Sequence, residues 1–141
     1  MKKALFTLTL MLCSLLHAQT EGQLKEIQPS VEFENIHVLK LNSDSAQTSF
    51  VIWVKKAVKA HYHAFHTENI YVLDGKAEMT LNDTTFMVRK GDYLNIPKQS
   101  IHSVNKVYGR KPLKVLSIQS PEFKGKDRIF IESKAKPNED Y

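Results

Sequence analysis

Three histidines lie within six positions of one another in this chain, at His61, His63 and His66. If this segment is a β-strand, residues two apart project from the same face, so His61 and His63 point to one side together. Two imidazoles on one face can bind a divalent metal ion with little rearrangement. Glu68 would add a negatively charged oxygen ligand, and His102 could complete the set from a distant strand.

The donor types narrow the choice of metal ion. Three imidazole nitrogens and one carboxylate suit Fe, Mn, Ni, Co, Cu or Zn better than Ca or Mg. We therefore expect one divalent transition metal from this group as cofactor. Four protein ligands leave about two positions of an octahedron open for water, substrate or oxygen, and open positions are typical of reactive centres.

The histidine run is part of a longer pattern of fixed spacings. Residues 61 to 75 read H-x-H-x₄-E-x₆-G, and residues 91 to 97 read G-x₅-P, with His102 following on the next predicted strand. These patterns resemble the two sequence motifs of the cupin family. The fifteen residues between Gly75 and Gly91 match the short spacing of compact microbial cupins, and the resemblance covers about residues 48 to 120.

The resemblance implies an all-β fold, a single-domain cupin-type β-barrel that is also described as a double-stranded β-helix or jelly roll. It also implies that the metal is bound by His61, His63, Glu68 and His102. Two glycines of the family motifs are replaced here, by Lys55 and by Gln99. Neither change removes a ligand, but the turn at Gln99 must either take another backbone form or hold a non-glycine residue at some strain.

The predicted fold is built from short strands, because no stretch keeps an apolar period of 3.6 residues over three turns. Runs of β-type residues recur about every eight to twelve positions. The expected strands are Ile36–Leu41, Ser49–Val54, Ala57–His63, Asn69–Leu73, Lys76–Leu81, Thr84–Arg89, Tyr93–Ile96, Ser100–Val104, Lys114–Gln119 and Arg128–Ile131. Asp74-Gly75 and Asn82-Asp83 each separate two runs and tolerate the positive φ of tight hairpin turns.

The N-terminus has the organisation of a secretory signal peptide. Two lysines precede an apolar run from Ala4 to Leu16, and Ala18 provides a small residue for cleavage. Cleavage of the signal peptide would also remove Cys13, so we expect neither disulfides nor thiolate chemistry in the mature protein. We expect this protein to be exported, periplasmic or secreted, with no membrane attachment. The expected divisions are a signal peptide over 1–18, a lead-in over 19–30, the cupin barrel over 31–132 and a flexible tail over 133–141.

Further polar residues are candidates near the site. His66 is out of register with the other two histidines of its run, so we expect it at the rim of the pocket, where it could shuttle protons. Tyr93 and Asn95 share one face of a strand and are candidates for hydrogen-bonding groups that line the pocket. His37 precedes both motifs and is expected to be structural.

The charge pattern argues against a nucleic-acid partner. The chain has 20 basic and 15 acidic residues, and without Lys2 and Lys3 its net charge falls from +5 to +3. The basic residues near the C-terminus are spread among acidic ones and do not alternate with aromatic residues. We expect a small-molecule ligand or substrate instead, and the resemblance to cupins implies a homodimer.

Three functions are compatible with these residues. The first is a metal-dependent enzyme of dioxygenase, isomerase, decarboxylase or lyase type that acts on a small organic molecule, because family members with this ligand set catalyse such reactions. The second is a non-catalytic exported module that binds a metal or a small ligand, since no convincing general acid or base accompanies the ligands. The third is a β-barrel whose histidines bind nothing and whose role is assembly.

Overall fold

Ten strands follow one another along the chain in the computed structural model, which describes residues 22–131. They are β1 (Ile36–Ser43), β2 (Thr48–Val54), β3 (Val58–His63), β4 (Thr67–Asp74), β5 (Lys76–Leu81), β6 (Thr84–Arg89), β7 (Tyr93–Ile96), β8 (His102–Tyr108), β9 (Leu113–Ser120) and β10 (Arg128–Phe130). All ten expected strands are present, and the bounds of β5, β6 and β7 agree with the predicted ones. The predictions for residues 1–18 and 133–141 lie outside the described residues.

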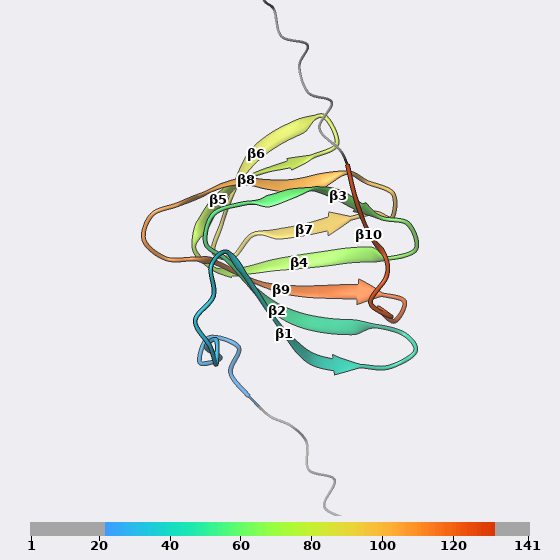
Figure 1. Cartoon of the computed structure of the whole chain (residues 1–141), viewed down its shortest axis with the longest axis horizontal. Coiled ribbons are helices and arrows are strands. Elements are labelled where there is room, and N and C mark those ends of the chain that lie inside the picture. The colour runs from blue at the N-terminus through green and yellow to red at the C-terminus, as the bar shows by residue number, and fades with distance from the viewer. Residues whose placement is uncertain (1–21, 132–141) are drawn as a thin grey trace, which may run out of the picture.

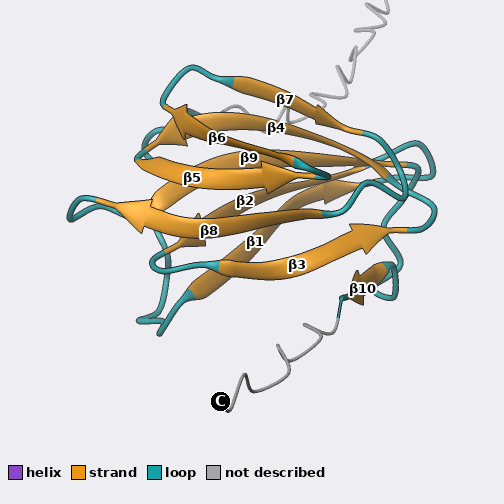
Figure 2. Ribbon diagram, turned by 90° about the horizontal axis from the view of Figure 1, so that it is seen from above, coloured by secondary structure: helices purple, strands orange, loops and turns teal. Residues whose placement is uncertain are grey.

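The strands form two antiparallel sheets that face each other (Figures 1 and 2). The first sheet has the order β1-β2-β9-β4-β7, and the second has the order β10-β3-β8-β5-β6. The predicted all-β jelly-roll fold is therefore confirmed. Among residues 22–131, strand pairing does not continue from one sheet into the other, so the two layers do not close into a barrel. Within residues 22–131 no helix is long and apolar enough to cross a membrane.

Alternation along the strands determines which side chains enter the space between the sheets. Along β4, Glu68, Ile70 and Val72 are buried, whereas Tyr71 between them is exposed. The core combines apolar residues of both sheets and consists of Val54, Ile70, Val72, Ala77, Met79, Val88, Leu94, Ile96, Val104, Leu113 and Val115. Because Glu68 shares its face with this core, its carboxylate points inward rather than into solvent.

The two predicted turns differ in what they connect. Asn82 has a φ of 51°, and the turn joins β5 to β6 as the expected hairpin, with Leu81 paired to Thr84. Asp74 and Gly75 do not form a hairpin, because β4 and β5 belong to different sheets. This pair instead carries the chain from the first sheet to the second, and the sequence prediction of a hairpin there is wrong.

Gly75 is required at this crossing for two separate reasons. Its φ of +86° lies in the left-handed region, which favours glycine. A β-carbon at this position would also lie 2.5 Å from the carbonyl oxygen of Pro112 and 2.8 Å from the α-carbon of Leu113. The chain therefore passes from sheet to sheet in close contact with the backbone that enters β9.

We expect the substitution Gly75→Ala to destabilise the protein by about 3 kcal/mol, because strain at positive φ and overpacking against backbone add together. Gly109→Ala is the matched control, since Gly109 has a φ of +88° and no atom within 4 Å of the added carbon. The free energy of unfolding from urea titration measures both. Equal losses in the two variants would show that the contact with Pro112 is unimportant.

Candidate metal centre

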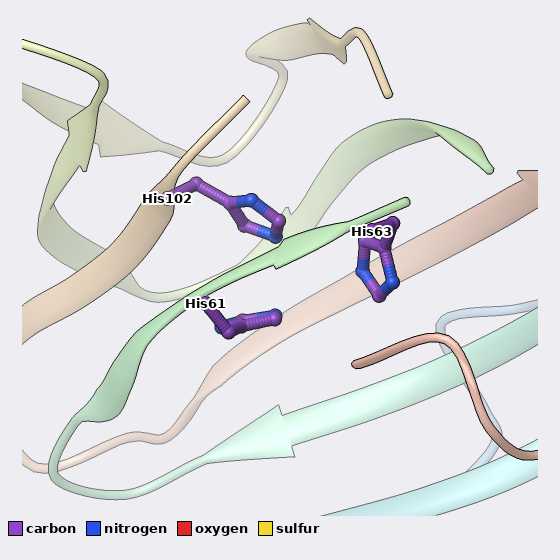
Figure 3. Close-up of side chains that lie close together, drawn as sticks. All are labelled: His61, His63 and His102. Atoms are coloured by element: carbon purple, nitrogen blue, oxygen red, sulfur yellow. The ribbon is translucent and has the colours of Figure 1, made fainter. Parts of the chain in front are cut away.

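Four buried side chains converge between the sheets from three different strands. β3 supplies His61 and His63, β8 supplies His102 directly opposite His61, and β4 supplies Glu68 from the facing sheet. Figure 3 shows the three imidazoles directed toward a common space. Between 2% and 5% of each residue is exposed. The four predicted ligands are therefore brought together, and His61 and His63 share one face of β3, as strand alternation predicts.

The spacing of the donor atoms suits one metal ion. One ring nitrogen from each of His61, His63 and His102 lies within 4.8 Å of the other two. Glu68 Oε2 lies 3.5 Å from His63 Nε2 and 3.3 Å from His102 Nε2. Ligands about 2.1 Å from an octahedral ion are about 3 Å apart when adjacent and about 4.2 Å apart when opposite. The observed separations fall close to this range.

Backbone carbonyls fix the tautomer of all three histidines. His61 Nδ1 donates to the carbonyl oxygen of Lys59 at 2.8 Å. His63 Nδ1 donates to that of Asp127 at 3.0 Å, and His102 Nδ1 donates to that of Ser100 at 3.0 Å. Because a carbonyl oxygen only accepts, each Nδ1 carries a hydrogen. Nε2 is then the nitrogen of each ring that is available to a metal ion, and such a second hydrogen bond is how proteins orient histidine ligands.

The polar atoms left over at the centre also fit a bound cation. His102 Nε2 is buried and has no hydrogen-bond partner among residues 22–131. Ser117 Oγ and Gln119 Nε2 both donate to Glu68 Oε1, the latter at 3.3 Å, which leaves Oε2 directed at the imidazoles. A buried nitrogen without a partner is unfavourable unless something coordinates it. The residues therefore fit a divalent transition metal ion.

The ionisation of His61 and Glu68 also fits a bound metal ion. Burial lowers the pKa of His61 to about 4, and nearby His102 contributes, although the hydrogen bond to the Lys59 carbonyl partly opposes this. His61 is thus neutral at pH 7, as a ligand must be. Burial alone would raise the pKa of Glu68, but contacts with His102, His63 and Ser117 hold it well below its usual range. Glu68 is therefore anionic, as a carboxylate ligand of a cation would be.

His66 is not a rim residue, in contrast to the sequence prediction. It is 5% exposed, its Nδ1 contacts the carboxylate of Asp127, and its Nε2 donates to the carbonyl oxygen of Glu122 at 2.9 Å. Both ring nitrogens face acceptors, so Asp127 and the carbonyl group of Glu122 hold the ring from two sides. His63, His66 and Asp127 lie close enough to hold an ion, but this pairing occupies His66.

Asp127 is the residue of the site that sequence analysis missed. Its carboxylate accepts hydrogen bonds from the backbone N–H groups of Ala64, Phe65 and His66 at 2.9–3.2 Å, and its carbonyl oxygen accepts from His63. Burial opposes ionisation of Asp127, but these hydrogen bonds lower its pKa below the usual value. The sequence signal was weak, a single acidic residue between Lys126 and Arg128.

Tyr93 and Asn95 lie outside the pocket, which corrects the prediction that they line it. Tyr93 is 63% exposed, and both residues donate hydrogen bonds to Asn69 Oδ1 on the neighbouring strand, at 2.7 and 2.8 Å. Their strand neighbours Leu94 and Ile96 are the buried ones. The shared face was identified correctly, but it is the outer face of the first sheet.

Gln99 stands where the second cupin motif has a glycine, and its backbone is strained. Its φ is 67°, in the left-handed region, so the second of the two expected alternatives holds. Its N–H donates to the carbonyl oxygen of His63 at 2.6 Å. The turn before β8 is thereby fixed to the strand that carries two of the metal ligands.

The four predicted ligands line a cavity of about 60 Å³ between the sheets. Its other walls are mainly apolar and include Ile52, Val54, Met79, Val104, Leu113 and Val115. Apolar walls with a few convergent polar groups are typical of small-molecule sites.

Comparison with known proteins agrees with this geometry. A cupin domain model matches residues 49–119, about half of the chain, and these residues include all four ligands. The chain belongs to the cupin family. This cupin is 35% identical over 112 residues to an uncharacterized protein of Aquifex aeolicus (strain VF5), with 79% of this chain and 89% of that protein covered.

Two further similarities concern a shorter stretch and the fold. Over 43 residues this cupin is 37% identical to quercetin 2,3-dioxygenase of Bacillus subtilis (strain 168), which covers 30% of this chain and 13% of that enzyme. A conserved protein with a double-stranded β-helix domain from Klebsiella pneumoniae has a similar structure, with a TM-score of 0.67 and 14% identity. That match covers 82% of this cupin and 99% of the other chain, and it bears on the fold alone.

We expect His102→Ala to lower the affinity for a divalent transition metal by at least about a hundredfold, because loss of a ligand costs more than the 10–100-fold typical of supporting residues. His37→Ala is the control, since His37 packs its ring 5.5 Å from that of Trp53, away from the cluster. Metal content by mass spectrometry after equilibrium dialysis measures both variants. Equal metal content in the wild type and His102→Ala would contradict the assignment.

We expect Asp127→Asn to cost about 3 kcal/mol of stability, because a buried pair loses one charge and the new amide N–H groups face backbone donors. It should also weaken metal binding about tenfold through the altered support of His63. Thermal unfolding of the metal-free protein and metal titration measure the two effects separately. Asp83→Asn, at an exposed turn, is the control. An unchanged melting temperature in Asp127→Asn would refute the structural role.

Proposed function

We propose that this cupin is a metal-dependent enzyme that acts on a small organic molecule at the His61, His63, His102 and Glu68 centre. The observation that carries the proposal is the convergence of three Nε2 lone pairs and one carboxylate on the wall of an apolar cavity. A purely structural ion would need no such space beside it. We further propose that the protein acts after export, on the basis of the signal-peptide pattern in residues 1–18.

The residues divide the chemical work among themselves. A bound divalent ion would polarise a substrate oxygen, and a redox-active one could also react with oxygen. The imidazoles would hold the ion without adding charge, and Glu68 would cancel one of its two positive charges. The apolar walls exclude water, which strengthens the electrostatic interactions of the bound substrate. Dioxygenase, isomerase and decarboxylase chemistry are all compatible with this division.

A second candidate function is a non-catalytic module that binds a metal or a small ligand. The observation in its favour is the scarcity of acid–base groups. Apart from the four ligands, the polar residues that line the cavity within residues 22–131 are Ser103 and Arg128. Neither is suited to act as a general base near neutral pH, since a hydroxyl is a weak base and a guanidinium stays protonated.

A turnover screen separates the two candidates. The protein is loaded in turn with Fe(II), Mn(II) and Ni(II) and tested against phenolic, thiol and keto-acid substrates, with and without oxygen. We expect turnover that depends on one of these metals and falls at least about a hundredfold in His102→Ala. Access to the ion is checked independently by adding azide or nitric oxide and recording the EPR spectrum. An ion that is bound but inaccessible to both probes would refute the enzymatic function.

A further inference from the structure

Arg128 extends from β10 on the same face as two of the metal ligands. β10 pairs antiparallel with β3, and the partners in register are Arg128 with His63 and Phe130 with His61. Side chains of directly paired residues lie on the same face of a sheet. The Phe130 ring accordingly lies 5.8 Å from that of His61, and Arg128 lines the cavity.

The guanidinium of Arg128 is the one cationic side chain among the residues that line this cavity. Within residues 22–131 no carboxylate lies within 4.0 Å of its nitrogens. Arg128 therefore presents unpaired donors beside a cavity whose walls, apart from the four predicted ligands and Ser103, are apolar.

The position of Arg128 is held by its neighbour. Asp127 binds three backbone N–H groups of the loop between β3 and β4 and pairs with His66. Ile131 N–H then donates to Ala60 O at 3.0 Å beyond the short strand. The backbone of Arg128 is thus held between two fixed points, while its side chain is exposed beside the cavity.

We propose that Arg128 determines ligand specificity and that the centre takes a small organic carboxylate, held by its carboxylate between Arg128 and the metal ion. This inference rests on the proposed function, because it assumes an occupied metal site. The charges favour an anion, since a divalent ion and Arg128 together exceed the single negative charge of Glu68. A planar guanidinium also binds a carboxylate through two parallel hydrogen bonds.

The cavity limits the size of this ligand. A volume of about 60 Å³ corresponds to about four to six water-sized positions, at ~10–15 Å³ for each. The ligand therefore has a small apolar body that contacts walls such as Ile52, Val104 and Leu113. A larger molecule would extend past Arg128 and the exposed Phe130 into solvent.

The test compares propionate with propionamide, its neutral isostere, on the Co(II)-loaded protein. Isothermal titration gives both dissociation constants, and the visible spectrum of Co(II) reports whether the probe reaches the ion. A metal ion alone also binds a carboxylate more tightly than an amide. The decisive quantity is therefore how far the Arg128→Gln substitution changes the ratio of the propionate and propionamide affinities. We expect Arg128→Gln to lower the affinity for propionate at least tenfold, with the propionamide affinity and the cobalt content unchanged.

Two further variants sharpen this comparison. Arg128→Lys keeps the charge and should retain part of the propionate affinity. Lys124→Gln removes an exposed charge from the same segment without touching the cavity and should change nothing. Undiminished propionate binding by cobalt-loaded Arg128→Gln would overturn the role of Arg128 and leave the metal-dependent function intact.

Failure of the wild type to bind cobalt would instead refute the proposed function. In that case propionate binding to the metal-free protein decides the role of Arg128. If the metal-free wild type prefers propionate to propionamide and Arg128→Gln does not, the role of Arg128 is supported. If the metal-free wild type binds both probes equally, that role is overturned.

Discussion

The carboxylate of Asp127 accepts hydrogen bonds from three consecutive backbone N–H groups and pairs with the His66 imidazole. The same residue accepts the Nδ1 hydrogen of His63 on its carbonyl oxygen. One buried residue therefore joins the loop after β3, a metal ligand and the start of β10. Because β10 has three residues and pairs with β3 alone, it depends on this anchor for its position.

Backbone geometry, more than side-chain contacts, prepares the histidines for a metal ion. Each of the three Nδ1 atoms donates to a main-chain carbonyl, two of them within their own strand region and one across to the Asp127 segment. A main-chain carbonyl cannot rotate as a side chain does, so the tautomer is fixed by the fold itself. The lone pairs of Nε2 are then brought together before any ion binds, which reduces the reorganisation that binding requires.

The ten strands and the shared face of His61 and His63 could be predicted because both follow from local rules, whereas Glu68 and His102 were added to the site through the resemblance to the cupin motifs. Period-two alternation put His61 and His63 on one face, and turn residues marked the strand ends. Alternation does not by itself say which face is inner, and Tyr93 and Asn95 were assigned to the wrong one. The apolar neighbours Leu94 and Ile96 carried that information. Asp127 acts through contacts with residues about sixty positions away, and the crossing at Gly75 depends on sheet order, which no local pattern contains.

The departure at Gln99 shows what the family glycine supplies at this turn. The turn needs an N–H directed at the carbonyl oxygen of His63, and a φ of 67° achieves this. Glycine adopts such a φ without cost, whereas another residue pays roughly 1 kcal/mol or more. Gln99 keeps the hydrogen bond, so the cost is offset locally and the strand of His63 is still held at its carbonyl oxygen. His63 is therefore fixed at two points, by Gln99 through its backbone and by Asp127 through its ring.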